Sequence, residues 1–314
     1  ELDSAAIIAK IKDAGIVGMG GATFPTHVKL SIPNGCKAEF LIINGVECEP
    51  YLTSDHRTML ERGEELLVGV EILKKALGVE KAIIGVENNK PDAIANLNKI
   101  IAEKKFPIVV EPLKVQYPQG GEKQLIAAVT GRQVPAPPAL PIDVGAVVCN
   151  ASTAVAVYEA VQKNKPLIER VVTVTGAAVP SPKNLLTRFG TPVEALIAKC
   201  GGLAEGEVKV INGGPMMGRA LSNIAMPVMK GCSGITIMVG SATVRGVESA
   251  CIKCAKCVEA CPMGLEPYLL SKQARKRAWD AMEANDIISC IECGCCQFTC
   301  PANIPLLDYV RLGK

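Results

Sequence analysis

The chain has 314 residues, of which 49% are hydrophobic and 4% aromatic, and it carries a net charge of +3. This length predicts about two or three domains, while the small charge and the few aromatic rings argue against nucleic-acid binding. The stretch that comes nearest to a membrane span, Val144–Tyr158, is interrupted by Asn150 and Thr153, so we expect no transmembrane segment. Because the first residue is Glu1 rather than methionine, we expect a fragment or a processed product.

Residues 1–165 alternate short apolar runs with helical patterns. The apolar runs predict strands at Phe40–Ile43, Ala82–Val86, Ile108–Leu113 and Val144–Cys149. Helical periodicity predicts a first helix that is capped by Ser4 and ends at Gly15. Further helices are predicted through Leu66–Leu77 up to Gly78, from Pro91 onward, over 123–131 and over Thr153–Gln162. Strands separated by helices are typical of a mainly parallel sheet with helices on its faces. We therefore predict an α/β domain over residues 1–165.

The pattern changes after residue 165. Strands are expected at Val171–Thr175, Val208–Ile211 and Ile235–Val239, with one short helix beginning at Thr191 and Pro192. Strands arranged around a single helix predict a small β-grasp (SLBB-like) domain over residues 166–244. The remainder, residues 245–314, is expected to be a helical domain built around cysteine-containing loops.

The same cysteine spacing, C-x2-C-x2-C-x3-C-P, occurs twice in this last part. The two runs are Cys251, Cys254, Cys257, Cys261 and Cys290, Cys293, Cys296, Cys300. This spacing is typical of [4Fe–4S] clusters, and in two-cluster ferredoxins the fourth cysteine of each run ligates the other cluster. We therefore predict two clusters, the first held by Cys251, Cys254, Cys257 and Cys300 and the second by Cys261, Cys290, Cys293 and Cys296. Two neighbouring clusters indicate a protein that transfers electrons.

Zinc and disulfides are the alternatives for these cysteines. A zinc site uses four ligands and would leave the regular third and fourth cysteines of each run unexplained. A disulfide framework suits a short secreted chain, whereas this long chain shows no signal-peptide pattern. Fourteen cysteines without an export signal favour a reducing cytoplasm, and exposed clusters would favour an anaerobic one.

Three polar or glycine-rich segments stand outside the cysteine region: Gly18–Thr26, Asn44–Pro50 and Tyr117–Glu122. The glycines of the first segment allow the backbone to lie against a flat or anionic ligand. The segment is neither a Rossmann fingerprint nor a P-loop, since Thr23 occupies the last glycine position and no G-K-[ST] follows. The other two follow or adjoin predicted strand ends, where open α/β sheets bind ligands.

Together these segments resemble the flavoprotein subunit of respiratory complex I, and more closely the RnfC family of NADH-side subunits in Rnf electron-transport complexes. The similarity to RnfC rests on G-x-G-G-A-x-F-P-T-H-V-K-L at Gly18–Leu30, N-G-x-E-C-E-P-Y-L-T-x-D-H-R at Asn44–Arg57, G-G-P-M-M-G at Gly213–Gly218 and the two ferredoxin runs. The resemblance implies an oxidoreductase that uses FMN and NAD(H), peripheral on the cytoplasmic face of the cell membrane. It also implies ferredoxin-like and membrane subunits of the Rnf complex as partners.

The resemblance further implies roles for single residues. The FMN site would consist of Gly18, Gly20, Gly21, Lys29, Asn44, Glu47, Gly120, Gly121, Asn150 and Thr153. NADH would stack on Phe24, be positioned by Tyr117 and Glu122, and be held at its ribose or adenine end by Glu49. Relative to complex I, Met19 replaces an arginine, Thr23 and His27 replace glycines, and Gly121 replaces an acid.

Two other functions fit the same sequence. A soluble paralogue of RnfC would feed NADH electrons to a dedicated reductase, and a non-catalytic carrier would hold the clusters without a working flavin site. The intact glycine segment with Lys29, Glu47 and Glu49 argues against the carrier.

The remaining cysteines and the two histidines carry weaker expectations. Cys36, Cys149 and Cys200 are expected to be small buried residues, Cys295 breaks the ligand spacing, and Cys48 lies between acids that disfavour a thiolate. Cys232, flanked by glycine and serine, is expected to be exposed, and a redox role is the less favoured interpretation of it. His27 and His56 are expected at the surface or in hydrogen bonds rather than on a metal.

Overall fold

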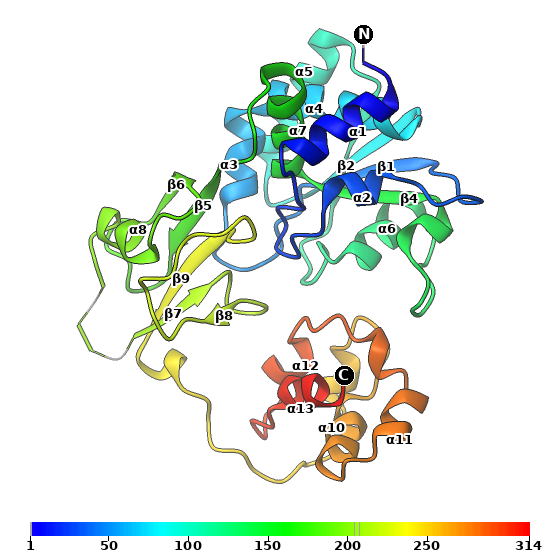
Figure 1. Ribbon diagram of the computed structural model, residues 1–314. Helices are drawn as coiled ribbons and strands as arrows, with labels where there is room; N and C mark the ends of the chain where they lie inside the picture. The colour runs from blue at the N-terminus through cyan, green and yellow to red at the C-terminus, as the bar shows by residue number, and fades with distance from the viewer. Residues whose placement is uncertain (1, 204, 207) are drawn as a thin grey trace.

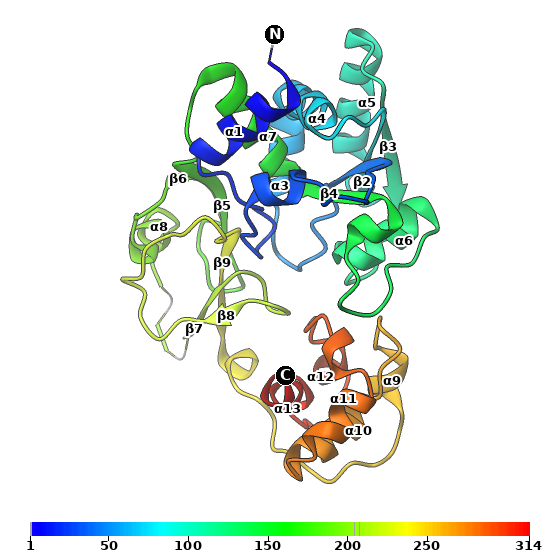
Figure 2. The ribbon, with the colours of Figure 1, turned by 45° about the vertical axis from the view of Figure 1, so that its right-hand side comes forward.

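The computed structural model describes residues 2–203, 205–206 and 208–314, and it folds into three units (Figure 1). A helix-covered sheet is formed by the N-terminal half, a second sheet follows it, and a helical unit at the C-terminus lies beneath the first sheet, next to β8 (Figures 1 and 2). An extended stretch of chain connects the second sheet to the helical unit.

The first sheet is entirely parallel, with strand order β3-β2-β1-β4. Its strands are β1 (Phe40–Asn44), β2 (Lys81–Glu87), β3 (Ile108–Leu113) and β4 (Ala146–Asn150). The helices of this unit are α1 (Ser4–Asp13), α2 (Thr26–Leu30), α3 (Ser54–Glu61), α4 (Gly63–Leu77), α5 (Pro91–Lys104), α6 (Glu122–Thr130) and α7 (Ala151–Lys163), with a 3-10 turn at Pro141–Val144. The predicted parallel α/β domain is confirmed.

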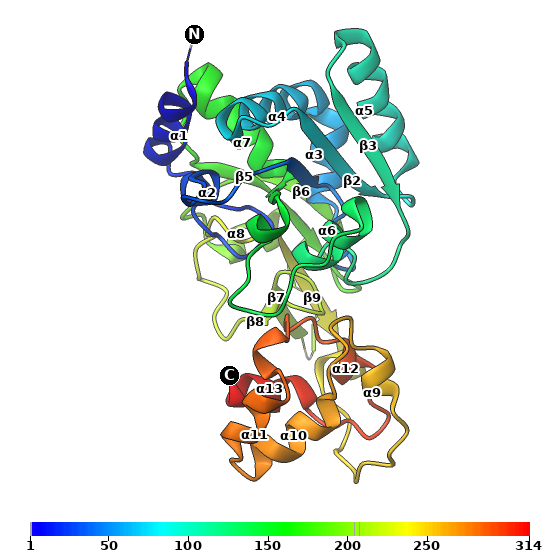
Figure 3. The same ribbon diagram turned by 90° about the vertical axis from the view of Figure 1, so that its right-hand side faces the viewer.

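Both faces of the sheet are buried along β1 and β4, which explains why these two strands read as continuous apolar runs. Leu41 and Ile43 of β1 belong to the core beneath α1, α4 and α7, whereas Ile42 points to the opposite face, where α6 supplies Leu125 and Ile126. Figure 3 shows α4 and α7 on one side of the sheet and α6 on the other. Alternate residues of one strand thus contribute to two separate cores.

The strand order reverses between β1 and β4. From β1 the chain moves outward through β2 and β3, and then returns to place β4 on the other side of β1. Asn44 and Asn150 are paired in register as the last residues of β1 and β4. Because open α/β sheets bind ligands beyond the carboxyl ends of the strands at such a reversal, this edge is the candidate ligand site of the domain.

The second unit is a mixed five-stranded sheet with order β6-β5-β9-β7-β8. Its elements are β5 (Glu169–Thr175), β6 (Lys183–Arg188), α8 (Val193–Lys199), β7 (Val208–Asn212), β8 (Arg219–Ala220) and β9 (Gly234–Val239). The parallel pair of β5 and β9 lies between antiparallel neighbours, and α8 packs on the sheet through Val193, Leu196 and Ile197. A sheet packed on a single helix agrees with the predicted β-grasp arrangement.

The third unit consists of short helices joined by the cysteine loops. After a 3-10 turn at Gly240–Thr243 come α9 (Lys256–Glu259), α10 (Pro267–Arg275), α11 (Trp279–Ala284), a 3-10 turn at Ile287–Ser289, α12 (Cys295–Phe298) and α13 (Leu306–Gly313). Leu270, Met282 and Val310 form one of its two small cores, and Ala302, Ile304 and Leu306 form the other. Cysteines of the two predicted clusters pack against both cores.

Two local expectations were wrong or incomplete. The first helix is capped by Asp3, whose carboxylate accepts the Ala6 N–H over 2.8 Å, while the Ser4 hydroxyl instead bonds to the carbonyl of Ala76. The sequence pattern also missed α2 and α3, because both are short and follow loops rather than an apolar period. These two helices turn out to border the candidate ligand site.

Candidate flavin site and cluster cavities

The glycine-rich segment forms a tight turn that is anchored on its inner side. The turn is closed by the Gly18 N–H, which donates to the Phe24 carbonyl over 2.8 Å. Met19 at its centre is held from both directions, since its N–H donates to Thr153 Oγ1 over 2.9 Å and its carbonyl accepts from the Arg170 guanidinium over 3.0 Å. Gly20, Gly21 and the Phe24 ring are exposed on the outer side. The turn therefore presents open backbone and one aromatic ring, which suits a flat, anionic ligand.

The two paired asparagines at the sheet edge fix the loops around it. The Asn44 amide donates to the Gly120 carbonyl over 2.8 Å and so connects the Asn44–Pro50 and Tyr117–Glu122 segments. Asn150 donates to the Asp55 carboxylate over 2.6 Å and caps α7 by accepting the Thr153 N–H. The three segments that were distant in the sequence therefore meet at one edge of the sheet.

Lys29 and Glu122 also meet at this edge. Lys29 Nζ, on α2, lies 2.8 Å from Glu122 Oε1 on α6 and 3.0 Å from the carbonyl of Val148 on β4. The Lys29 side chain is one-third exposed. The ion pair holds an ammonium group at the edge of the site, where it can face an anionic phosphate.

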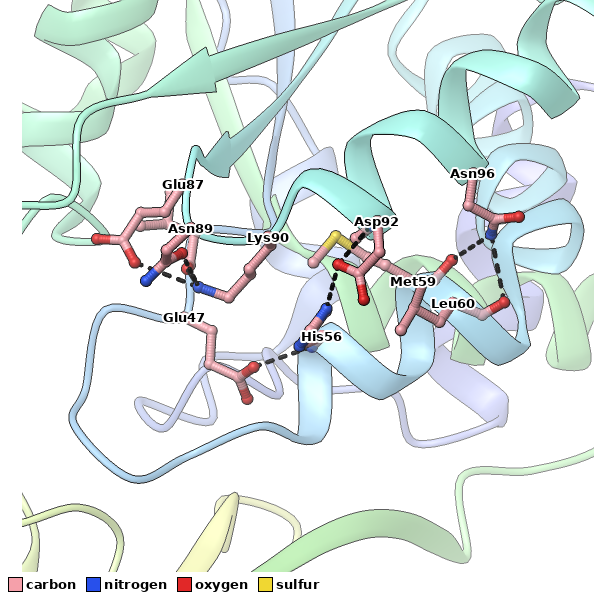
Figure 4. Close-up of polar contacts among 11 residues, drawn as sticks. Glu47, His56, Met59, Leu60, Glu87, Asn89, Lys90, Asp92 and Asn96 are labelled. Atoms are coloured by element: carbon pink, nitrogen blue, oxygen red, sulfur yellow. Dashed lines mark hydrogen bonds and ion pairs between the residues drawn. The ribbon is translucent and has the colours of Figure 1, made fainter.

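The Glu47 carboxylate points toward His56 in the first turn of α3 (Figure 4). Its carboxylate accepts the N–H groups of Asp55 and His56, over 2.8 and 2.9 Å, and the Ser54 hydroxyl over 3.1 Å, at the N-terminus of α3. Burial, followed by repulsion from Asp55, raises the pKa of Glu47 to about 7. Glu47 thus joins its loop to α3, and any contribution to a flavin site is made through the position of that loop.

A buried lysine that sequence reasoning missed, Lys90, supports the same loop (Figure 4). Lys90 Nζ lies 2.8 Å from the carbonyl of Val46 and 3.2 Å from Glu87 Oε2, and both Lys90 and Glu87 are buried. The sequence offered no signal for it, because a lysine before the proline that opens a helix reads as a surface residue. His56, on the adjacent α3, pairs with Asp92 over 2.8 Å and so has the hydrogen-bonding role expected for it.

Glu49 and Tyr117 lie at the junction of the three units. Glu49 Oε1 accepts the N–H groups of Met216 and Met217, over 2.6 and 3.0 Å, from the turn before β8. The Tyr117 hydroxyl donates to the carbonyl of Cys293 over 2.8 Å. Burial raises the pKa of Glu49, and burial together with the Glu49 charge raises the pKa of the Tyr117 phenol. Both residues, expected on NADH, contact other parts of the chain here.

The eight regularly spaced cysteines divide between two cavities. Each cavity combines three cysteines of one run with the fourth cysteine of the other, and we call this predicted arrangement crossed ligation. One cavity is lined by Cys251, Cys254, Cys257 and Cys300, and the other by Cys261, Cys290, Cys293 and Cys296. Within the described residues, no three His, Cys, Asp or Glu side chains converge as ligands of a single metal ion. Thiols that surround a cavity fit the corners of a cubane cluster better than one tetrahedral zinc ion. The residues present therefore fit two [4Fe–4S] clusters.

The six other cysteines are mostly buried. Cys149, Cys200 and Cys295 are buried, but Cys36 is only half-buried, which corrects the expectation for it. Cys232 is also buried rather than exposed, and burial raises the pKa of its thiol to about 11. A buried thiol with a raised pKa does not favour a redox role for Cys232. Burial raises the pKa of Cys48 to about 11 as well, with the Glu87 and Glu49 charges adding to the effect.

Comparison with known protein families agrees with these three units. The profile of the Nuo51 FMN-binding domain matches residues 11–159, that of the SLBB domain matches residues 171–220, and that of a 4Fe-4S dicluster domain matches residues 250–304. The solved structure of an NAD+-reducing [NiFe]-hydrogenase in the H2-reduced state is similar in fold, with a TM-score of 0.70 and 20% identity over 98% of this chain and 62% of that one. Fold and site thus define a flavin- and iron–sulfur-binding electron-transfer protein.

Two curated relatives, both RnfC proteins, are similar over the whole chain. The RnfC protein of the proton-translocating ferredoxin:NAD+ oxidoreductase complex of Clostridium ljungdahlii is 48% identical, covering 100% of this chain and 68% of the relative. Its counterpart in the Na+-translocating ferredoxin:NAD+ oxidoreductase complex of Acetobacterium woodii is 45% identical, covering 100% and 70%. The chain belongs to the RnfC family, and the predicted resemblance is confirmed. In the described parts of the chain, no helix has the length and apolar character needed to span a membrane.

Proposed function

We propose that this chain is the NADH-side electron-transfer subunit of an Rnf-type complex, exchanging electrons between NAD(H) and a ferredoxin-like partner. The observation that carries the proposal is the contact between the flavin-side loop and the cluster loop, in which the Tyr117 hydroxyl binds the Cys293 carbonyl over 2.8 Å. Bound FMN supplies the conversion between the two-electron chemistry of nicotinamide and the one-electron chemistry of iron–sulfur clusters. The chain itself has to orient the cofactors and keep them close together.

In this proposal the residues of the sheet edge divide their tasks. The exposed glycines of the Gly18–Phe24 turn and the Lys29 ammonium hold the flavin and its phosphate. The exposed ring of Phe24 stacks on the dinucleotide. Asn44 and Asn150 act at the ends of β1 and β4 by fixing the loops that close the site. Glu49, Tyr117 and Glu122 remain our candidates for positioning NADH, alongside Glu47, Gly120, Gly121 and Thr153 for FMN.

The two cysteine sets complete the electron path in this proposal. Cys251, Cys254, Cys257 and Cys300 would hold the first cluster, and Cys261, Cys290, Cys293 and Cys296 the second. We propose ferredoxin-like and membrane subunits of an Rnf complex as partners, with the chain attached to the inner face of the cell membrane. The names of the two relatives, which place them in ion-translocating complexes, support this assignment. We also propose domain boundaries near residues 165 and 244, and the gaps between the three profile matches support them.

An anaerobic NADH titration tests the electron path. Protein reconstituted with iron, sulfide and FMN is titrated with NADH and followed by absorbance and EPR, with an FMN-free sample as the control. We expect reduced-cluster signals only in the sample that contains FMN. Clusters that stay oxidised with NADH but are reduced by dithionite would favour the non-catalytic carrier instead.

A separate experiment distinguishes the membrane complex from a soluble paralogue. The chain, expressed with an affinity tag at its natural level in its own cells, is purified from gently solubilised membranes and from the cytosolic fraction. Recovery together with integral membrane subunits supports the Rnf complex. Recovery from the cytosol with a soluble reductase would support the paralogue.

A further inference from the structure

The G-G-P-M-M-G turn, Gly213–Gly218, has no role in the function described so far, although it is one of the motifs on which the resemblance to RnfC rests. It lies between β7 and β8 and meets the flavin-side loop at Glu49. Both consecutive amides of Met216 and Met217 donate to a single Glu49 carboxylate oxygen. A carboxylate that accepts two backbone N–H groups makes strong, charge-assisted hydrogen bonds, so this turn is held firmly against the flavin domain.

The same turn also reaches the cluster loop. A Cβ atom at Gly294, which lies between Cys293 and Cys296, would stand 3.1 Å from the Met216 carbonyl oxygen. On its other side, a Cβ atom at Gly214 would stand only 2.0 Å from Cγ of Glu49. The turn is therefore enclosed between the Glu49 side chain and the loop that carries three cysteines of the second set. Two glycines permit this close approach.

A second, direct contact connects the flavin domain with the same cluster loop. Tyr117 donates its hydroxyl to the Cys293 carbonyl, and the phenol lies near the Glu49 carboxylate. On the neighbouring helix α6, the Gln124 amide lies 3.0 Å from the sulfur of Met263, in the loop that follows Cys261. All three contacts converge on the second cysteine set. In contrast, Cys254 of the first set is exposed.

We propose that Glu49 and Tyr117 are positioning residues that hold the Cys290–Cys296 loop against the flavin domain, with the Gly213–Gly218 turn as the spacer between Glu49 and that loop. The inference rests on the proposed function in one respect, namely that electrons pass between the flavin and the second cluster. The packing itself is independent of electron transfer. Loosening the contact would slow electron transfer to the clusters while NADH still reduces the flavin.

The test uses the full reconstituted holoprotein with Gly214→Ala and Tyr117→Phe, and with Tyr158→Phe as the matched control. The added methyl of Gly214→Ala forces the turn and the Glu49 side chain apart, so flavin reduction is measured in the same variant at saturating NADH. Tyr117→Phe removes only the hydroxyl that binds Cys293. Tyr158, on α7, is remote from the junction and in contact with Lys163. The first readout is hydrogen–deuterium exchange of residues 290–296, without NADH.

We expect exchange in residues 290–296 to rise roughly fivefold in Tyr117→Phe, as the loss of one hydrogen bond implies, and further in Gly214→Ala. Tyr158→Phe should match the wild type. The second readout is stopped-flow reduction at saturating NADH. Relative to flavin reduction in the same variant, cluster reduction should slow about tenfold, as a loss of about 1.4 kcal/mol implies, and dithionite should still reduce both clusters.

Unchanged exchange in both variants would overturn the inference. So would cluster reduction that slows only in proportion to flavin reduction, since that result would assign the residues to nucleotide binding alone. Because the exchange readout needs no electron transfer, it can succeed even if NADH fails to reduce the wild type. Failure of the proposed function and failure of this inference are therefore distinguishable. If Gly214→Ala does not fold, Tyr117→Phe provides both readouts.

Discussion

The Asn150 side chain donates to the Asp55 carboxylate over 2.6 Å, and this bond connects the end of β4 to the first turn of α3. The other oxygen of Asp55 accepts the Ser152 hydroxyl over 2.5 Å. Asp55 is buried, so the cost of leaving its partners without an acceptor is high. The Asp55 carboxylate thereby connects Asn150, which caps α7, to α3, the helix whose N-terminus binds Glu47.

We predict that Asp55→Ala destabilises the fold and weakens the flavin site together. The variant leaves Asn150 and Ser152 without their acceptor, so the free energy of unfolding should fall by about 1–3 kcal/mol. FMN affinity, measured by fluorescence quenching, should fall about tenfold as the Asn150 amide loses its orientation. Asp92→Ala, which removes an exposed partner of His56, is the control and should cost less than about 1 kcal/mol. Equal effects in the two variants would contradict the prediction.

We predict a large stability loss for Lys90→Met. The substitution leaves the buried Glu87 carboxylate and the Val46 carbonyl without the ammonium group, and breaking such a pair typically costs about 3–5 kcal/mol. Lys90→Met combined with Glu87→Gln should recover part of the loss. Lys99→Met, in an exposed pair with Glu103, is the control and should change stability by less than about 1 kcal/mol. Urea unfolding of the three variants measures these differences, and a loss in Lys90→Met no larger than in the control would refute the role.

The raised pKa of Glu47 predicts a pH-dependent contribution to stability. Its pKa rises from 4.5 to about 7, so between these values the folded chain binds more protons than the unfolded chain. The Glu47 contribution to the free energy of unfolding therefore falls as pH rises through this window and reaches its minimum above about pH 7. Glu47→Gln lacks this titration. The Tm of the variant should therefore rise relative to the Tm of the wild type as the pH increases from about 5 to about 8. A constant Tm difference across that range would argue against the titration.

Crossed ligation predicts which cysteine variants behave alike. Cys251→Ser and Cys300→Ser lie in different runs but line the same cavity, so both should lose the same EPR signal and about half of the iron. Cys290→Ser should instead lose the other signal. Cys295→Ser, next to a proposed ligand, is the matched control and should keep both clusters. If Cys300→Ser and Cys290→Ser lost the same signal, each run would hold its own cluster.

The sequence alone determined the cluster chemistry and the order of the three units. Ligation of a [4Fe–4S] cluster depends on cysteines at short, regular spacings, which can be recognised in the sequence itself. The alternation of apolar runs with helical periods likewise predicts a parallel sheet. The glycine-rich segments were recognisable for a similar reason, because a tight turn that exposes its backbone needs glycine locally. Cys232 shows the limit of this reasoning, since two small neighbours suggested exposure while the chain around them buried it.

Tertiary structure decided the roles of the charged residues around the site. The resemblance placed Glu47 and Glu49 on the cofactors, and nothing in the sequence singled out Lys90. Their partners in the folded chain come from α3, from the turn before β8 and from the loop after β1. Burial and partner geometry depend on segments that are distant in the sequence, so no local pattern encodes them. For the same reason, only the folded chain shows that Tyr117 contacts Cys293, 176 positions later.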